Sequence, residues 1–312
     1  MGRRPKLKGN IVDGMVVVDK PSGMSSFDVV SAARRAYNCQ RAGHTGTLDP
    51  AATGVLVVCF GTATRFVSYL TGLDKGYRGV AKLGVRTSTD DAEGEPLSTS
   101  SVSTEHRRVA VQALRDMVGP LSQVPPQVSA IKMDGKRAYA RVRDGEEVIM
   151  EPRDVVVRSV EIDPDDSVVD EIHFDSNVSK GTFIRSMARD AGDAAGCGGH
   201  LSSLRRTAIG ALDLSMATPL DSLGESEEIR ATALRCPSIG LGHLPSTELD
   251  DETLRDLGHG KLPPAEGWDA EPLVVARAAG RFVGLIAAVP GADGRQFWKV
   301  VRLLPTAELL RT

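Results

Sequence analysis

The sequence predicts an α+β protein in which a larger domain is followed by a small β-rich module. The chain has 312 residues, about twice the length of an ordinary domain. Short β-branched runs such as Met15–Asp19 and Val55–Phe60 alternate with segments of helical periodicity. The C-terminal part contains several short strand patterns and one hairpin pattern. Together these observations predict two structural units of different character.

Turn and cap residues delimit the first expected elements. Residues 1–10 are basic and lack apolar periodicity, so we predict a flexible arm. The run Met15–Asp19 predicts a buried strand that ends at a Lys-Pro-Ser-Gly turn. Ser25 or Ser26 then caps a helix. The expected buried face of this helix is formed by Phe27, Val30, Ala33 and Tyr37.

The middle of the chain continues this alternation. A polar, solvated turn is expected at 87–94, and a Pro-rich irregular segment at 123–132. Thr182 is the expected N-cap of a helix over 182–195. The other expected elements are strands at 55–60, 77–85, 154–162 and 171–178 and helices at 62–70 and 109–118.

The C-terminal third divides into a connection and the β-rich module. The stretch 213–245 is weakly patterned and is interpreted as the inter-domain connection. An acidic helix start at 249–254, a hairpin around Gly280 and a strand at 298–302 then form the module.

Composition excludes several classes of protein. The formal net charge of −3 excludes a uniformly basic nucleic-acid binder, although local basic patches remain. No apolar run reaches the roughly 18 residues of a membrane span, and no apolar signal segment follows the basic start. The four cysteines (Cys39, Cys59, Cys197 and Cys236) form no CxxC pair, and the histidines are dispersed. We therefore expect a cytoplasmic protein without a membrane partner or a metal site.

The segment Gly43–Pro50 (Gly-His-Thr-Gly-Thr-Leu-Asp-Pro) is the most unusual part of the chain. Its glycines and proline favour a rigid loop that could hold Asp49 as a nucleophile or general base. An Asp-Pro turn that closes a hairpin is the alternative. A similar Thr-Gly-Thr-Leu occurs in phosphoryl-transfer pumps, but there the phosphorylated aspartate precedes it, whereas here it follows. A phosphate-binding loop with Lys-Ser/Thr is also missing, so phosphoryl transfer is disfavoured.

Three further features could carry function. Arg185 opens a helix among apolar neighbours, so it is either a buried guanidinium that needs an anionic partner or a surface arginine. Tyr77 has glycines on both sides in the sequence, which would leave its ring approachable. Core packing of the ring is the alternative. A run over 129–143 has five basic residues, Lys132, Lys136, Arg137, Arg141 and Arg143, against Asp134 alone. This run is either a solvated charged face or a strip that binds a polyanion.

Taken together, these segments resemble the bacterial tRNA pseudouridine-55 synthase family, the TruB type that is related to dyskerin. The similar segments follow the family order over most of the N-terminal two thirds of the chain. They are Asp19–Ser26, Gly43–Pro50 with the following Ala-Thr-Gly-Val-Leu, Lys75–Tyr77, Leu83–Thr87, Gln123–Tyr139, Ser179–Arg185 and Gly198–Arg206. The end of the chain is similar to a PUA-like domain. The resemblance implies a pseudouridine-synthase fold with a mixed, largely antiparallel central sheet flanked by helices.

The resemblance also implies domains and partners. It places the catalytic domain at 11–230, with an insertion at about 122–152 that grips RNA, and the PUA-like domain at 240–312. It implies the T-arm stem-loop of tRNA as the substrate and no obligate protein partner. We expect a monomer that uses no cofactor and no metal.

Site residues follow by similarity at matching positions. Asp49 corresponds to the catalytic aspartate, Tyr77 to the tyrosine that stacks on the uracil, and Arg185 to the aspartate's partner. Phe183 lies where some relatives have tyrosine, so that a ring is kept and a hydroxyl is lost. The residues implied to support the loop or bind substrate are Lys20, His44, Phe183, Leu204, Lys132 and Arg137.

Two other functions are compatible with parts of the sequence. A non-catalytic RNA-binding or RNA-remodelling protein would need the basic run over 129–143 and a second group of basic residues between 180 and 206, but not Asp49. A carboxylate-pair hydrolase would need a second acid beside Asp49, and the nearest acids, Asp90, Asp91 and Glu93, lie in the expected solvated turn. The isomerase remains the favoured function.

Overall fold

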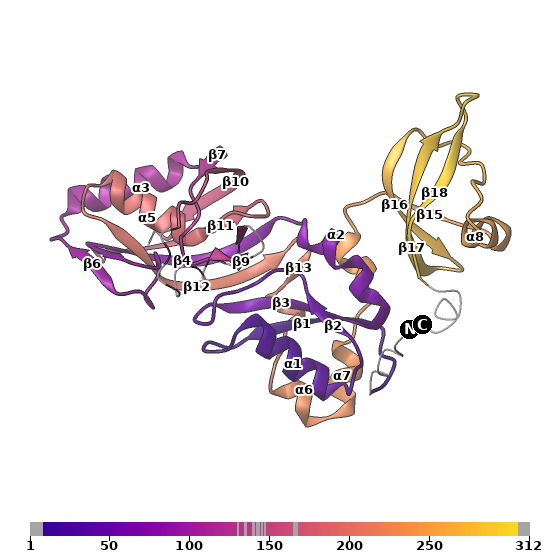
Figure 1. The fold of residues 1–312 in the computed structure, drawn as a ribbon, viewed down its shortest axis with the longest axis horizontal. Helices are drawn as coiled ribbons and strands as arrows, with labels where there is room; N and C mark the ends of the chain where they lie inside the picture. Colours follow the sequence, from indigo (N-terminus) through magenta and orange to yellow (C-terminus); the bar gives the residue numbers. More distant parts are fainter. Residues whose placement is uncertain are drawn as a thin grey trace.

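A computed structural model describes residues 9–129, 131–133, 136–138, 141, 144, 146, 148–164 and 168–304. Its largest element is one mixed sheet that runs through the N-terminal three quarters of the chain (Figure 1). In sheet order its strands are β14 (Thr218–Pro219), β1 (Gly14–Lys20), β3 (Thr53–Phe60), β12 (Gly199–Ile209), β4 (Lys75–Leu83), β11 (Glu171–Val178), β10 (Arg153–Ile162) and β7 (Gly119–Gln123), with β2 (Ala42–His44) on β3 and β13 (Leu212–Asp213) on β12.

Strand direction in this sheet is mostly antiparallel. Of the pairs described, β1 with β14 and β3 with β12 are parallel, and the others are antiparallel. This confirms the expected α+β class with a mixed, largely antiparallel sheet. The β3–β12 pair joins only two positions, Thr53 with Arg205 and Gly54 with Arg206, at the centre of the sheet.

Helices cover the two halves of the sheet separately (Figure 1). Helices α3 (Thr104–Asp116) and α5 (Ile184–Ala194) pack on the half formed by β4, β11 and β10, where Leu114, Phe174 and Met187 share a core. The other half, around β1 and β3, is packed by α1 (Ser26–Ala36), α6 (Ser222–Glu225) and α7 (Glu227–Ala233). Two small hairpins add to this framework, β5 (Val85–Thr87) with β6 (Pro96–Thr99) and β8 (Lys132–Met133) with β9 (Lys136–Arg137).

Helix α1 begins as expected and buries the expected face except at one position, because Val30, Ala33 and Tyr37 are buried as predicted. Ser25 is the N-cap and forms a capping box with Asp28. The buried positions include Ser26, Val30 and Ala33, whereas Phe27 is 75% exposed, so its expected burial is wrong. The reason is that the Ser26 hydroxyl hydrogen-bonds to the backbone of Leu48, which directs the following residue outward.

The stretch 213–245 is more than a connection. It contains α6, α7 and a 3-10 segment, Pro237–Leu241, and its Leu223 and Leu241 are fully buried in the cores of the larger unit. The expected helix at 62–70 is a 3-10 turn, Gly61–Phe66, followed by the short helix α2 (Val67–Thr71). No helix in the described part of the chain is both long enough and apolar enough to cross a bilayer.

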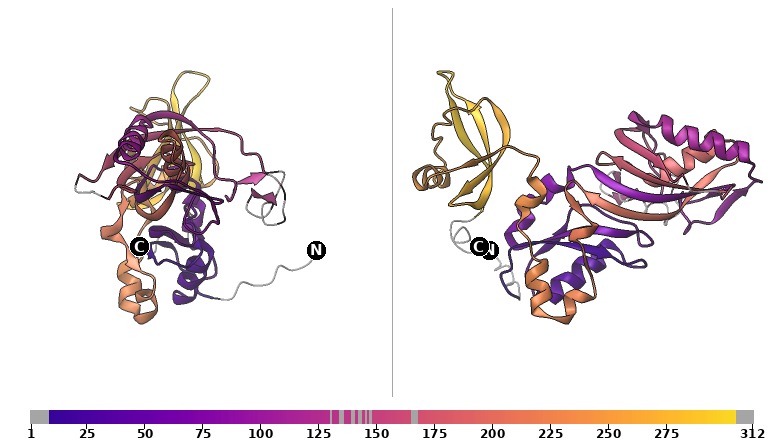
Figure 2. Two further views of the ribbon diagram at one scale, coloured as in Figure 1. Left: turned by 90° about the vertical axis from the view of Figure 1, so that its left-hand side faces the viewer. Right: turned by 180° about the vertical axis from the view of Figure 1, so that it is seen from behind.

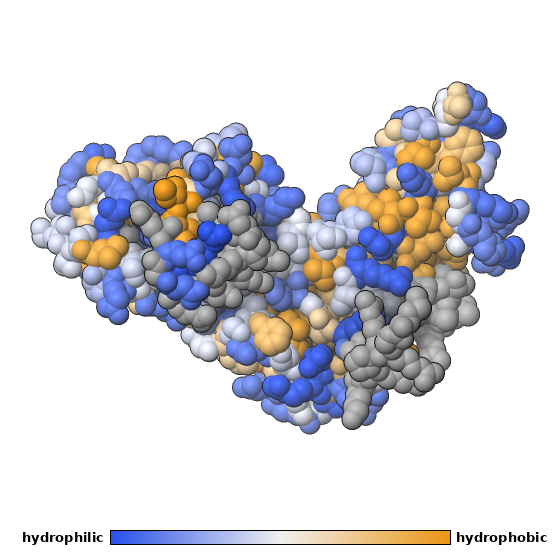
Figure 3. Space-filling model, viewed as in Figure 1, coloured by the Kyte–Doolittle hydropathy of each residue, from blue (hydrophilic) through white to orange (hydrophobic). Residues whose placement is uncertain are grey.

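The C-terminal module is a four-stranded sheet with one helix, as expected for a small β-rich unit. Its elements are β15 (Ser246–Glu248), α8 (Asp251–Gly258), β16 (Glu271–Ala278), β17 (Arg281–Pro290) and β18 (Gln296–Leu303). Apolar residues gather on the face of this module that is turned toward the larger unit (Figures 2 and 3). There Phe282 packs edge-on against Phe66 of the larger unit, with ring centroids 5.1 Å apart.

Candidate active site

Asp49 lies on a loop between β2 and β3 whose backbone is held by side chains from other segments. The Ser26 hydroxyl accepts a hydrogen bond from the Leu48 N–H at 2.8 Å and donates to the Leu48 carbonyl at 3.0 Å. The Lys20 ammonium donates to the carbonyls of Pro50 at 2.9 Å and Ala52 at 2.6 Å. Because these anchors flank Asp49 on both sides, the loop fixes the direction of its carboxylate.

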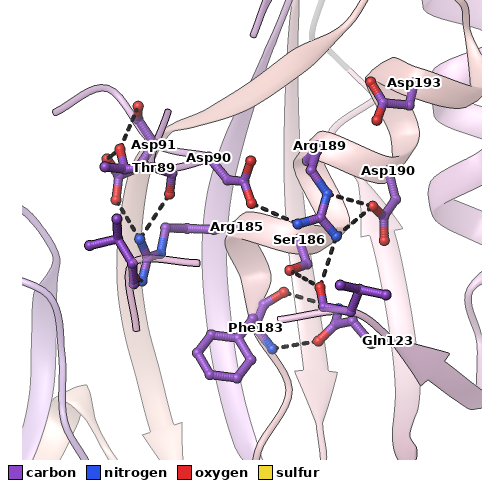
Figure 4. A network of polar contacts seen from close by, with 12 residues as sticks. Thr89, Asp90, Asp91, Gln123, Phe183, Arg185, Ser186, Arg189, Asp190 and Asp193 are labelled. Atoms are coloured by element: carbon purple, nitrogen blue, oxygen red, sulfur yellow. Dashed lines mark hydrogen bonds and ion pairs between the residues drawn. The ribbon is translucent and has the colours of Figure 1, made fainter. Parts of the chain in front are cut away.

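Arg185 brings three segments together at this carboxylate. Its Nε lies 3.2 Å from Asp49 Oδ2. Its Nη1 donates to Asp91 Oδ2 at 3.0 Å and to the Thr89 carbonyl at 2.9 Å. Its Nη2 donates to the Val128 carbonyl at 2.9 Å (Figure 4 shows Arg185 with Thr89 and Asp91). The guanidinium is therefore buried, paired and fixed in orientation. The alternative of a surface arginine is wrong.

The segment 87–94 differs from the solvated turn that the sequence predicts. Asp91 contacts Arg185, and Asp90 forms an ion pair of 2.7 Å with Arg189, one helical turn further along α5 (Figure 4). Burial raises the pKa of the Asp90 carboxyl, and the positive charge of Arg189 opposes that rise. The turn is polar because it supplies counter-ions to the buried Arg185 and the partly buried Arg189. A local sequence pattern cannot distinguish such a turn from a solvated one.

The start of α5 also differs from expectation. Its N-cap is Phe183, without a side-chain cap, and the Thr182 hydroxyl donates instead to the Ser179 carbonyl. The Gln123 side chain takes over the role of the cap: it accepts from the Phe183 N–H at 2.8 Å and donates to the Phe183 carbonyl at 3.1 Å. This places the end of β7 against the first turn of α5.

A cavity of about 300 Å³ opens beside Asp49. This volume lies at the low end of the range for small-molecule sites. The Asp49 side chain is 41% exposed and faces the cavity, whereas the Arg185 side chain behind it is 7% exposed. Of the residues implied by resemblance, the cavity is lined by Asp49, Tyr77, Phe183, Arg185 and Leu204.

The remaining predicted residues lie elsewhere. Lys20 is buried under the loop and does not line the cavity. His44 ends β2, where its Nδ1 accepts a hydrogen bond from the Gly46 N–H, and it is also outside the lining. Lys132 and Arg137 pair across β8 and β9, and their side chains lie outside the part of the structure that is described.

Four further cavity residues had no individual role assigned from the sequence, although Lys180 and Arg206 belong to the basic group around Arg185. Lys75, Ile131, Lys180 and Arg206 all contribute to the lining. The Lys75 ammonium donates to the carbonyls of Thr71 at 3.0 Å and Leu73 at 2.8 Å. Burial, and then the charge of Arg206, lower the Lys75 pKa to about 8. Lys75 and Lys180 both lie in segments that resemble the family, next to a glycine. A positive charge beside a glycine in such a segment is the sequence signal that could have identified them as cavity residues.

Lys20 is a second lysine with a perturbed pKa. Burial lowers its pKa to about 8, although the charge of Asp49 acts in the opposite direction. Among the described residues, no three His, Cys, Asp or Glu side chains lie close enough together to hold a metal ion. The groups that can act at the cavity are thus one carboxylate, one phenol and several cations.

Comparisons with known proteins agree with this geometry. A model of the TruB family pseudouridylate synthase N-terminal domain matches residues 34–184, and a model of the tRNA pseudouridylate synthase B C-terminal domain matches residues 185–236. A tRNA pseudouridine synthase B from Corynebacterium glutamicum (strain R) is 43% identical over 277 residues, which cover 88% of this chain and 91% of the relative. The chain belongs to the TruB family of pseudouridylate synthases.

Other members and solved structures extend the comparison. A tRNA pseudouridine synthase B from Burkholderia pseudomallei (strain K96243) is 41% identical and covers 83% of this chain and 82% of its own. A crystal structure of a Cbf5-Nop10-Gar1 complex has a TM-score of 0.73 at 25% identity and covers 95% of this chain and 87% of that chain. An H/ACA RNP bound to a substrate RNA containing 2'-deoxyuridine shares the fold, with a TM-score of 0.72 at 22% identity over 97% of this chain and 92% of that chain. The family and fold expected from the resemblance are therefore confirmed.

Proposed function

We propose that this enzyme isomerises uridine to pseudouridine at position 55 in the T-loop of tRNA, with Asp49 as the nucleophile. One observation carries the proposal: a half-exposed carboxylate is bound to a buried guanidinium at the wall of a cavity of nucleobase size. The names of the curated relatives supply the substrate class, because each is called a tRNA pseudouridine synthase B.

The reaction needs the kinds of group that this cavity has. The N1–C1′ bond of uridine breaks, the uracil turns, and a C5–C1′ bond forms; C5 loses its proton and N1 ends with one. Nothing is oxidised or transferred to a second molecule, so the step needs no cofactor. A fixed carboxylate can attack the sugar or the base and later leave again, as in other covalent catalysis.

The other lining residues have roles that follow from their positions. Tyr77 presents a nearly buried ring on which the everted base would stack, with an oxygen available as a base for the C5 proton. Phe183 and Leu204 give the cavity its apolar wall. Lys20 supports the Asp49 loop from below, and His44 would help to hold the target nucleotide outside its loop.

RNA binding would come from the insertion at 122–152, with Lys132 and Arg137 as phosphate contacts. The substrate must be everted, at a cost of a few kcal/mol that is lowest in an RNA loop. The T-arm of tRNA offers such a loop. We place the reaction in the cytoplasm and assign it to a monomer that acts without a protein partner.

The hydrolase alternative is disfavoured by the state of the second acid. Asp91 lies near Asp49, but its Oδ2 accepts from Arg185 while its Oδ1 accepts from the Thr89 hydroxyl and the Glu93 N–H. The protein itself therefore supplies three donors to this carboxylate, and these donors hold it against Arg185. Asp91 orients Arg185 instead of forming a catalytic acid pair.

The test is to incubate purified protein with tRNA that lacks the modification, without added cofactor, and to map pseudouridine along the RNA. We expect the product at position 55. Asp49→Asn should abolish it, because the amide is no nucleophile, while the Kd for tRNA stays within about threefold of the wild type. Product formed by pure Asp49→Asn would contradict the nucleophile, and tight binding by the wild type without any product would support a non-catalytic RNA-binding protein.

A further inference from the structure

Arg206 is a fully buried cation that the proposed chemistry does not use. It has no exposed surface and is the largest fully buried side chain in the described part of the molecule. No carboxylate among the described residues lies within ion-pair distance of it. Burying an unneutralised guanidinium is expensive, and an apolar side chain of similar volume would ordinarily suit such a place better. A buried arginine at this position therefore needs a functional explanation.

All three nitrogens of this guanidinium bind backbone carbonyls at the Asp49 loop. Nη2 donates to Gly46 at 3.1 Å and Nη1 to Thr47 at 3.4 Å, both on the approach to Asp49. Nε donates to Val55 at 2.6 Å, where the chain has entered β3 after the loop. One planar group therefore joins the start of the loop to its exit.

This clamp completes a set of anchors along the loop. Ser26 binds Leu48, Lys20 binds Pro50 and Ala52, and the Ser22 hydroxyl donates to the Ala51 carbonyl. The Asp49 carbonyl accepts from the Ala52 N–H at 3.1 Å. Every backbone carbonyl from Gly46 to Ala52 then accepts a hydrogen bond, and those of Gly46 and Thr47 are bound by Arg206.

The sheet places Arg206 between the strand that carries Tyr77 and the strand that follows the Asp49 loop. In strand register it lies opposite Tyr77 on β4 and opposite Gly54 on β3. Arg206 is also among the residues around the cavity that Asp49 and Tyr77 line. A displacement of Arg206 would therefore move the aspartate loop relative to the tyrosine.

We propose that Arg206 is a positioning residue for the isomerisation: its three-way clamp sets the distance of Asp49 from the base and from Arg185. The inference rests on the proposed function. The clamp requires a planar group with three donors, because it binds the carbonyls of three residues, on both sides of the loop, at the same time. An error of about 1 Å in the placement of a nucleophile can reduce the rate of the chemical step by about 10²-fold.

The test compares single-turnover rates at saturating tRNA with binding. Arg206→Met keeps the length of the side chain and removes its charge and donors, so the rate should fall by about 10²-fold while the Kd changes less than threefold. Arg206→Lys keeps the charge but cannot span the carbonyls, and it should be nearly as slow. Arg205→Met is the matched control: Arg205 is the neighbour on β12, pairs with Asp19 at 2.7 Å, and should keep its rate within about twofold.

Chemical rescue provides a second measurement in case Arg206→Met or Arg206→Lys folds poorly. Arg206→Ala leaves space at the cavity wall, and added guanidinium should restore the rate at least tenfold, whereas it should not rescue Asp49→Asn. The inference is overturned if folded Arg206→Met retains a rate within threefold of the wild type, or if only its Kd changes. It is also overturned if guanidinium leaves Arg206→Ala unchanged. A wild type that forms no pseudouridine would refute the proposed function instead, so the two failures are distinct.

Discussion

At the scale of single residues, Arg185 matters for its shape as well as for its charge. Its nitrogens reach Asp49, Asp91 and the Val128 carbonyl from one plane. Arg185→Lys keeps a positive charge but offers a single point, so it cannot orient both carboxylates. We expect kcat to fall by about 10²-fold. Single-turnover assays check this, with Arg158→Lys as a control, since Arg158 forms an exposed pair with Asp74. Near-normal turnover by Arg185→Lys would show that it is not the aspartate's partner.

Lys20 makes the anchoring of the Asp49 loop depend on pH. Burial favours the neutral amine and lowers the Lys20 pKa to about 8, so the proton is lost at lower pH than from a free lysine. The ammonium donates to the carbonyls of Pro21, Pro50 and Ala52, and a neutral amine has one N–H too few for all three. We therefore expect kcat to decline as the pH rises through about 8.

Two variants separate Lys20 from the other perturbed lysine. Lys20→Met should be slower at pH 7 and should lack the decline assigned to Lys20. Lys75→Met removes a lysine whose pKa is also lowered to about 8, and the decline should persist in it. A kcat profile of Lys20→Met that still falls near pH 8 as in the wild type would assign the titration to another group.

At the scale of elements, the site depends on a close approach of β3 and β12. A Cβ added to Gly54, whose φ is +97°, would lie 2.2 Å from the Arg206 carbonyl oxygen. Gly54→Ala must therefore separate the strands and strain the backbone, and we expect a loss of about 3 kcal/mol in the free energy of unfolding. At Gly23, φ is +84° and no atom lies within 4 Å of an added Cβ. Gly23→Ala should cost only about 1 kcal/mol. Urea denaturation compares them, and equal losses would disprove the close approach.

Local signals predicted elements well where a cap or a β-branched run decides the structure. Ser25 caps α1 and Val55–Phe60 lies in β3, both as expected. The strand β12 was not predicted, because its Leu-Ser-Ser-Leu-Arg-Arg pattern has no alternation of polar and apolar residues. The reason is tertiary: Arg206 points into the aspartate loop, so a charged residue occupies an interior position.

The same limit applies to the site. The rigid loop around Asp49 could be argued from its glycines and proline, but its pairing with Arg185 could only be implied by resemblance, because the two residues are far apart in sequence. The roles of Asp90 and Asp91 were missed, since a turn that neutralises arginines of a neighbouring helix has the same composition as a solvated one. An ion pair between distant segments produces no periodic sequence pattern in either segment.

At the scale of the whole molecule, the two units are joined by apolar contact. Phe282, Val275 and Leu285 of the C-terminal module share a core with Phe66 and Leu241 of the larger unit. The Arg65 guanidinium adds a hydrogen bond of 3.1 Å to the Leu303 carbonyl. The contact between the module and the larger unit is therefore mainly apolar, with one hydrogen bond beside it.

Charge balance determines how such a body can bind a polyanion. With a formal net charge of −3, the chain as a whole does not attract RNA, so affinity must come from local clusters such as the one containing Lys132 and Arg137. Replacing both by alanine should weaken tRNA binding and reduce the slope of log K against log salt concentration by about 1.5, since each lost phosphate contact removes roughly 0.7–0.9. Arg108→Ala, which removes an exposed pair with Glu105 on α3, should leave the slope unchanged. Titrations at several salt concentrations measure both, and an unchanged slope in the double variant would return this segment to a solvated charged face.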